Sequence, residues 1–211
     1  RAEQVSFNRF LWNERVTTEE IKRSALDATM ANTARSDHIL AIQDTTEFDF
    51  TRRRNTVKGL GPIGDKKTER VGFLFHPVLA IDATDNFVYG LAACHHWVRP
   101  PSLPHDEKKK HPTRLRIEDK ESYRWISCAL EARATLSLAG MVTIVGDRES
   151  DIYDEFCRVP DSKTHLLVRS CHNRAVTVDS GETSMLQAHL DDRLVDGKVF
   201  LSVTGSDRNT L

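Results

Sequence analysis

The chain lacks the features that mark several common classes of protein. Its four cysteines, at positions 94, 128, 157 and 171, form no Cys-x-x-Cys pair. This spacing argues against a zinc ribbon or a disulfide framework and suits a reducing compartment. No apolar run approaches the roughly 20 residues that cross a bilayer, so we expect no membrane segment. The first residues, Arg1-Ala2-Glu3-Gln4, lack the apolar stretch of a signal peptide, and no Gly-x-Ser-x-Gly motif indicates a serine hydrolase.

The chain also has no excess of either charge, since 30 Lys and Arg residues face 31 Asp and Glu residues. The total therefore gives no sign of a nucleic-acid partner, but the local pattern does. Basic clusters fall in predicted loops, at Arg52-Arg53-Arg54, Lys66-Lys67 and Lys108-Lys109-Lys110. We predict that the first two clusters contact DNA phosphates, although a solvated surface would explain each cluster alone.

What the chain does contain is the composition of a globular protein, with 39% hydrophobic and 29% charged residues. Its periodicity predicts helices over 18–34, 119–138 and 150–158, and strands over 38–44, 71–81, 86–97, 142–147 and 166–168. Thr17 with Glu20 forms a capping box before the first helix, and the polar, glycine-rich stretch 45–70 is expected to be a long loop. Three strands followed by helix, strand, helix and strand is the order of a ribonuclease H-like α/β fold, a mixed sheet flanked by helices. We expect a helical lead-in over 1–36, this core over 37–174 and a mostly β segment over 175–211, with β character at 176–178, 185–190 and 198–203.

Two of the predicted strands end on an aspartate. Four apolar residues, Ile39 to Ile42, read as a strand buried on both faces, and Asp44 follows at its rim. The strand over 142–147 ends in the same way on Asp147. In the predicted topology the first and fourth strands lie side by side, which would bring the two carboxylates together. Two carboxylates with substrate phosphate can hold Mg²⁺, so we predict that Asp44 and Asp147 share a two-metal site for Mg²⁺ or Mn²⁺.

Each aspartate also has a plainer interpretation as a cap or turn residue at a strand end. Glu149 and Asp151 could offer extra metal ligands, but the favoured interpretation places them in the first turn of a helix, where carboxylates interact well with the helix dipole. Arg148, beside Asp147, is a candidate phosphate contact, because guanidinium groups match phosphate geometry. Arg169 and Arg174, which leave the last predicted strand, are the best candidates for gripping a DNA strand.

Two further patterns carry little weight. The segment Gly59–Gly64 matches Gly-x-Gly-x-x-Gly, but it does not leave a strand and open a helix, so a turn is the better interpretation. A zinc site from Cys94-His95-His96 with Cys171-His172 is disfavoured, because neighbouring residues on a strand point to opposite faces.

Several segments together carry a family resemblance. They are Asp44-Thr45-Thr46 after Ile-Leu-Ala-Ile, Gly146-Asp147-Arg148-Glu149-Ser150-Asp151-Ile152-Tyr153, Leu167-Val168-Arg169-Ser170, His76-Pro77-Val78-Leu79, Trp97-Val98-Arg99-Pro100 and Lys120-Glu121-Ser122. In this order and spacing, the chain from about Phe7 to Arg174 resembles the IS4 family of cut-and-paste DDE transposases.

The resemblance implies a catalytic domain that binds Mg²⁺ or Mn²⁺ and acts as a homodimer on transposon ends and target DNA, in the bacterial cytoplasm near the nucleoid. By position, Asp44 and Asp147 match the family's two catalytic aspartates, and Arg169 matches a DNA-contacting arginine. Cys171 stands where the family has a second basic residue. The segment after Arg174 is similar to the start of the family's β insertion subdomain.

The chain departs from the family at the third catalytic acid. The family's glutamate lies in a Tyr-x-x-Arg-x-x-x-Glu pattern, and none of Tyr89, Tyr123 or Tyr153 begins one. We therefore expect a fragment that is inactive by itself. A catalytically inactive, transposase-derived DNA-binding protein and a nuclease of the same fold remain as alternatives.

Overall fold

The computed structural model describes residues 2–65, 69–100, 115–178 and 180–193. They fall into two compact units, Arg1–Cys171 and His172–Leu211. Lys66, Lys67, the lysine run over 108–110 and the strand expected near 198–203 lie outside the described residues. Within the described ranges, no helix is both long and apolar enough to cross a membrane.

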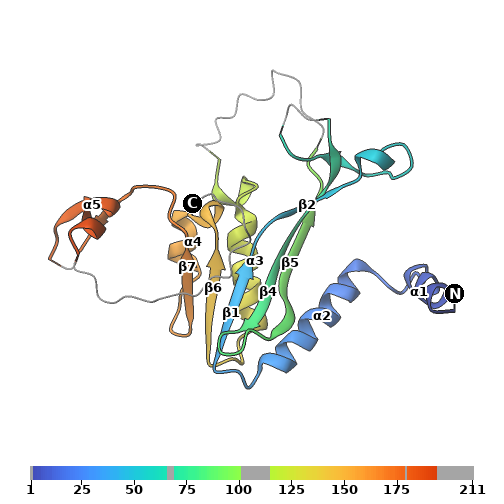
Figure 1. Ribbon diagram of the computed structural model, residues 1–211, viewed down its shortest axis with the longest axis horizontal. Helices are drawn as coiled ribbons and strands as arrows, with labels where there is room; N and C mark the ends of the chain where they lie inside the picture. The colour runs from blue at the N-terminus through green and yellow to red at the C-terminus, as the bar shows by residue number, and fades with distance from the viewer. Residues whose placement is uncertain (1, 66–68, 101–114, 179, 194–211) are drawn as a thin grey trace, which may run out of the picture. The chain divides into compact units, whose positions relative to one another are not determined.

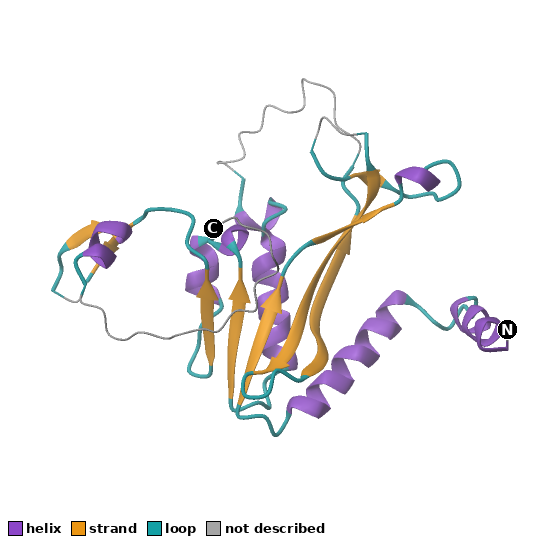
Figure 2. Ribbon diagram, viewed as in Figure 1, coloured by secondary structure: helices purple, strands orange, loops and turns teal. Residues whose placement is uncertain are grey.

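The first unit combines helices with one large sheet (Figures 1 and 2). Its α-helices are α1 (Ala2–Leu11), α2 (Thr18–Thr33), α3 (Tyr123–Thr135) and α4 (Tyr153–Arg158). Short 3₁₀ turns are η1 (Thr51–Arg53), η4 (Ile117–Asp119) and η5 (Arg148–Ser150). The strands are β1 (His38–Gln43), β2 (Thr46–Asp49), β3 (Gly61–Pro62), β4 (Val71–Asp82), β5 (Val88–Trp97), β6 (Met141–Gly146) and β7 (Thr164–Val168).

The sheet is mixed and is organised around the long strand β4. Its order is β2-β4-β1-β6-β7, with β3 and β5 also paired to β4. Strands β1, β6 and β7 run parallel, whereas β4 is antiparallel to β1 and β5. The predicted α/β class, with a mixed sheet flanked by helices, is therefore confirmed. So is the predicted pairing of the first strand with the fourth, β1 with β6.

Strands β1 and β2 are two parts of one extended segment. Gln43 pairs with Val78, and Thr46 pairs with Phe75, so the register along β4 does not change across Asp44 and Thr45. Only the regular pairing is interrupted there. The prediction of a long loop over 45–70 was wrong, because β2, a polar Thr-Glu-Phe-Asp sequence, gains its strand conformation by continuing this register.

The core lies on one face of the sheet, under α3. Ile39 and Ala41 on β1 are fully buried, and so are Val78 and Ala80 on β4. The prediction that β1 is buried on both faces was wrong, since Ile42 is 38% exposed. Successive strand residues point to opposite faces. On β1 only the face that carries Ile39 and Ala41 is fully buried, although the run is apolar on both faces.

Helix boundaries follow local capping. The side chain of Thr17 accepts the N–H of Glu20 at 3.1 Å, as the predicted capping box requires, and α2 begins directly after it. Helix α3 is shorter at both ends than the predicted 119–138, and the 3₁₀ turn η4 ends at Asp119, where the helix was expected to begin. An ion pair between Lys22 on α2 and Glu131 on α3, at 2.7 Å, joins the two helices.

The second unit has a small hairpin of β8 (Ala175–Thr177) and β9 (Thr183–Met185), followed by α5 (Leu186–Asp191). The expected β character is confirmed for the hairpin but was wrong for 186–190, which is helical. The side chain of Asn173 accepts the N–H of Gln187 at 3.0 Å, which satisfies a backbone donor in the first turn of this helix.

The core position of Ile144, fully buried at the centre of β6, gives a first prediction. Ile144→Ala is expected to lower the free energy of unfolding by about 2–5 kcal/mol, because it removes buried methyl groups and leaves a cavity. Leu138→Ala, at a side chain that is 59% exposed, should change it by less than about 0.5 kcal/mol. Chemical denaturation measures both, and equal effects would contradict this assignment of the core.

Candidate functional site

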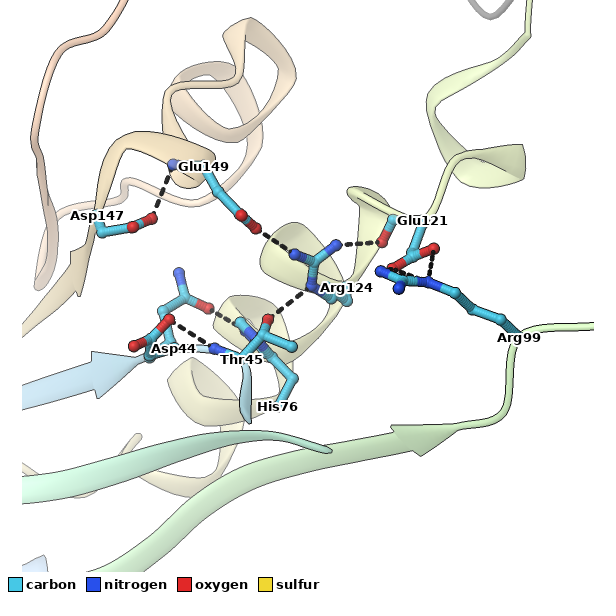
Figure 3. A network of polar contacts seen from close by, with 9 residues as sticks. Asp44, Thr45, His76, Arg99, Glu121, Arg124, Asp147 and Glu149 are labelled. Atoms are coloured by element: carbon cyan, nitrogen blue, oxygen red, sulfur yellow. Dashed lines mark hydrogen bonds and ion pairs between the residues drawn. The ribbon is translucent and has the colours of Figure 1, made fainter. Parts of the chain in front are cut away.

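The two predicted metal ligands occupy equivalent positions on neighbouring parallel strands. Ile42 pairs with Val145, and each aspartate lies two residues beyond its strand's paired residue. Adjacent strands are about 4.8 Å apart, so Asp44 and Asp147 leave the same end of the sheet side by side. Figure 3 shows both carboxylates there, and both residues are exposed.

Each aspartate also makes the local contact that the plainer interpretation requires. Oδ1 of Asp44 accepts the N–H of Thr45 at 2.7 Å. Oδ1 of Asp147 accepts the N–H of Glu149 at 2.7 Å and caps η5. Within the described ranges, Oδ2 of either aspartate accepts no hydrogen bond. The capping contact therefore fixes each carboxylate and leaves its second oxygen available.

This donor set fits a hard divalent cation. Exposed carboxylate oxygens are the ligands that Mg²⁺ prefers, and this ion commonly takes only one or two of them alongside water and phosphate. Among the described residues, no cluster of three acidic, histidine or cysteine ligand atoms within 4.8 Å of one another includes Asp44 or Asp147. In this part of the chain, Asp44 and Asp147 therefore have no third side chain of these kinds close enough to complete such a cluster.

Of the predicted DNA-contacting arginines, Arg148 and Arg169 lie near Asp147. Gly146 pairs with Val168, and the N–H of Arg169 donates to the carbonyl of Gly146 at 3.3 Å, so Arg169 leaves β7 beside Asp147. Arg148 is exposed in η5, directly after Asp147. These two arginines therefore lie next to Asp147. Arg174 belongs to the second unit.

Arg52, Arg53 and Arg54 are not brought to the aspartates. They lie in and directly after η1, and the whole of β2 separates this turn from Asp44. Arg52 and Arg53 instead line an open pocket of about 600 Å³, together with Asp49, Phe50, Thr51 and Arg70. Arg70 is held there by ion pairs to Glu47 at 3.1 Å and to Asp49 at 2.9 Å.

An arginine that the sequence did not single out joins the two aspartate-bearing segments. Nε of Arg124, on α3, donates to Oγ1 of Thr45 at 2.8 Å. One terminal nitrogen of the same guanidinium forms an ion pair with Glu149, and the other donates to the carbonyl of Glu121 at 3.1 Å (Figure 3). The side chain of Arg124 is only 10% exposed.

Two tryptophan rings complete the surroundings of Arg124. Its guanidinium carbon lies 5.4 Å from the ring of Trp97 and 5.6 Å from that of Trp125. Desolvated cation–π contacts of this kind stabilise a cation in a site with little water. The Lys120-Glu121-Ser122 segment, noted for its resemblance, was the signal closest to Arg124.

Two polar side chains occupy buried positions of the sheet at which apolar side chains are usual. Gln43 is 2% exposed and His76 is fully buried, at positions where the alternation of β1 and β4 points toward α3. His76 makes edge contact with the ring of Trp125. Burial, with smaller contributions from the charges of Arg124 and His95, lowers the pKa of His76 to about 3. The ring is therefore neutral at pH 7.

Glu155, on α4, is the fully buried carboxylate of this region. It accepts the amide of Gln43 at 3.0 Å and the hydroxyl of Ser150 at 2.8 Å. Burial raises its pKa to about 7, although both hydrogen bonds oppose the shift. Gly146 leaves the space for Ser150, because a Cβ at Gly146 would lie 2.4 Å from the hydroxyl oxygen.

The prediction that Glu149 and Asp151 occupy the first turn of a helix holds for Glu149 only in the short 3₁₀ turn η5, and it was wrong for Asp151, because α4 begins at Tyr153. Glu149 lies in η5 and pairs with Arg124. Asp151 is 6% exposed, and its Oδ2 accepts the N–H of Cys171 at 2.7 Å. That contact fastens the segment after Arg169 to the segment after Asp147.

No protein-family model matches the chain.

The buried Glu155 and His76 respond to pH in opposite senses. Glu155 has a pKa of about 7 against 4.5 for a free carboxyl, so its contribution to stability is lost as pH rises toward 7. His76 has a pKa of about 3 against 6.5 for free imidazole, so its contribution is lost as pH falls below 6.5. Between about pH 4.5 and 6.5 both groups affect stability. In this range each changes the free energy of unfolding by up to about 1.4 kcal/mol per pH unit, and the two changes have opposite signs.

Glu155→Gln should therefore expose the dependence due to His76. Between about pH 5 and 6, its free energy of unfolding is expected to rise with pH more steeply than that of the parent, by about 1.4 kcal/mol per unit. Denaturation at a series of pH values measures the slope, with Glu14→Gln at an exposed site as control. Parallel slopes in parent and Glu155→Gln would contradict a raised pKa.

Proposed function

We propose that this chain is the ribonuclease H-like catalytic core of a DDE transposase of the IS4 type, which cleaves transposon ends and transfers them into target DNA. The observation that carries the proposal is the parallel register of β1 and β6, in which Asp44 and Asp147 occupy matching positions beyond their strands. The strand order around β4 and the sequence resemblance described above support it.

Each residue of the site has a chemical role in this proposal. Asp44 and Asp147 offer carboxylate oxygens to Mg²⁺ or Mn²⁺, held by their capping contacts. The bound metal supplies activation of water and stabilisation of the leaving oxygen of a phosphodiester. Arg148 and Arg169 lie beside Asp147, where their guanidinium groups can bind the phosphates flanking the scissile bond.

The partner in this proposal is DNA, bound by a homodimer in the bacterial cytoplasm. Arg52, Arg53 and Arg54 lie a strand's length from the aspartates, so they would contact DNA away from the scissile phosphate. Phe48, Phe50 and Phe73 stack beside this turn, with the rings of Phe48 and Phe73 4.8 Å apart. An arginine-rich turn beside aromatic rings suits contact with the DNA backbone.

A specific observation favours a second candidate. In the described residues no third acidic side chain joins Asp44 and Asp147 within 4.8 Å. A DNA-binding protein that keeps the fold without chemistry would have this arrangement, and it would bind DNA with or without metal. The proposed enzyme, in contrast, must bind metal through both aspartates.

Calorimetric titration with Mn²⁺ separates these candidates. The parent is expected to bind Mn²⁺, and Asp44→Asn and Asp147→Asn are each expected to abolish measurable binding, because each removes one of the two anionic ligands. Asp37→Asn, an exposed aspartate before the opposite end of β1, is the matched control and should bind like the parent. A parent that fails to bind, or binding that survives both substitutions, would contradict the metal site.

DNA binding tests the arginines. Arg148→Ala and Arg169→Ala are each expected to weaken binding to duplex DNA and to reduce the slope of log affinity against log salt by about 1, since each removes one phosphate contact. Arg35→Ala, before the opposite end of β1, should leave affinity and slope unchanged. Fluorescence anisotropy over a range of salt concentrations gives both quantities, and unaltered slopes would exclude these two residues from the DNA interface.

A further inference from the structure

Two charged side chains of low exposure, each on a helix, bridge the segments that carry the aspartates. Arg124 on α3 binds Thr45, the residue after Asp44, and Glu149, two residues after Asp147. Glu155 on α4 binds Gln43, the residue before Asp44, and Ser150, three residues after Asp147. Each charged group therefore contacts both segments.

A continuous line of hydrogen bonds connects the two charges through β1 and β4. From Arg124 it passes to Thr45 at 2.8 Å, then to Nδ1 of His76 at 2.8 Å. Nε2 of His76 lies 3.2 Å from Oε1 of Gln43, whose amide nitrogen lies 3.0 Å from Glu155.

When Glu155 is ionised, only one arrangement of protons satisfies every member of this line. Arg124 can only donate, so the hydroxyl of Thr45 accepts from it and donates its own proton to Nδ1 of His76. The neutral ring then carries its proton on Nε2 and donates to the carbonyl oxygen of Gln43.

At the far end of the line, the amide of Gln43 donates to one oxygen of Glu155, and Ser150 donates to the other. Each hydrogen bond thus donates in the direction from Arg124 toward the buried carboxylate of Glu155. Because no member can reverse its donor and acceptor roles, the network holds these side chains in one geometry.

We propose that Arg124 and Glu155, with Thr45, His76 and Gln43 between them, are positioning residues that set the spacing of the Asp44 and Asp147 carboxylates and hence the affinity of the site for metal. This inference rests on the proposed function, because it requires Asp44 and Asp147 to share a metal. Partners behind the ligands of a metal site commonly change its affinity by about 10–100-fold when they are removed.

The sharpest test is at Thr45, which is only half-buried, so its substitution should leave the fold intact. Thr45→Val keeps the shape but removes the hydroxyl, leaving Arg124 and His76 without their shared partner. It is expected to weaken Mn²⁺ binding by about tenfold or more in calorimetry. Thr45→Ser restores the hydroxyl and should restore the parent's affinity. Thr46→Val, at the next, exposed residue, is the matched control.

Helix α3 offers matched controls for the charged residues. Arg124→Gln and Glu155→Gln are expected to weaken Mn²⁺ binding to a similar degree. Arg133→Gln and Glu131→Gln remove ion pairs on α3 that face Asp161 and Lys22, away from the aspartates, and should leave the affinity unchanged. Chemical denaturation of each variant records any change in stability separately.

The outcomes distinguish this inference from the function on which it rests. Mn²⁺ binding that needs both aspartates but is unchanged in Thr45→Val, Arg124→Gln and Glu155→Gln would overturn the inference and leave the metal site standing. Variants that lose stability but keep the parent's affinity would likewise reduce the line to a structural role and overturn it. A parent without Mn²⁺ binding would overturn both.

Discussion

The parallel pairing of β1 with β6 is the interaction on which the candidate site depends. It places the ends of two strands beside each other, and the aspartates that follow them lie at the same edge of the sheet because the strands run in the same direction. Strand β4 fixes the position of β1 because it pairs with β1 from Ile39 to Gln43 and continues in the same register along β2. The sheet thus places the two aspartates at one edge, and a local capping contact then fixes one carboxylate oxygen of each.

Much of this frame could be read from the sequence, because it depends on short-range patterns. The runs that became β1, β6 and β7 are apolar and flanked by polar residues, and Thr17 with Glu20 marked the start of α2. Strand β2 could not be read in this way. Its Thr-Glu-Phe-Asp sequence is typical of a surface turn, and it is a strand only because β4 offers it a paired edge.

The proximity of the two aspartates could be predicted from the sequence, but the buried polar residues that contact their segments could not. Sequence patterns assign polar residues to the surface, whereas Gln43, His76 and Glu155 are buried. Their burial is tolerable only because each finds a partner on a different element, and such partnerships form in the tertiary structure. Arg124 was missed for the same reason, since nothing near it in the sequence indicates that its guanidinium group contacts the rings of Trp97 and Trp125.

The hydrogen bond between Gln43 and Glu155 joins residues 112 positions apart in the chain. Contacts of such long sequence separation form late, because the chain entropy lost in closing so large a loop must be offset first. The segment that carries Asp44 therefore reaches its final geometry only after β6 and α4 have assembled on β1. During synthesis, the hydrogen bond between Gln43 and Glu155 must wait until the ribosome has released the residues through Glu155, so until then the residue before Asp44 lacks its buried partner.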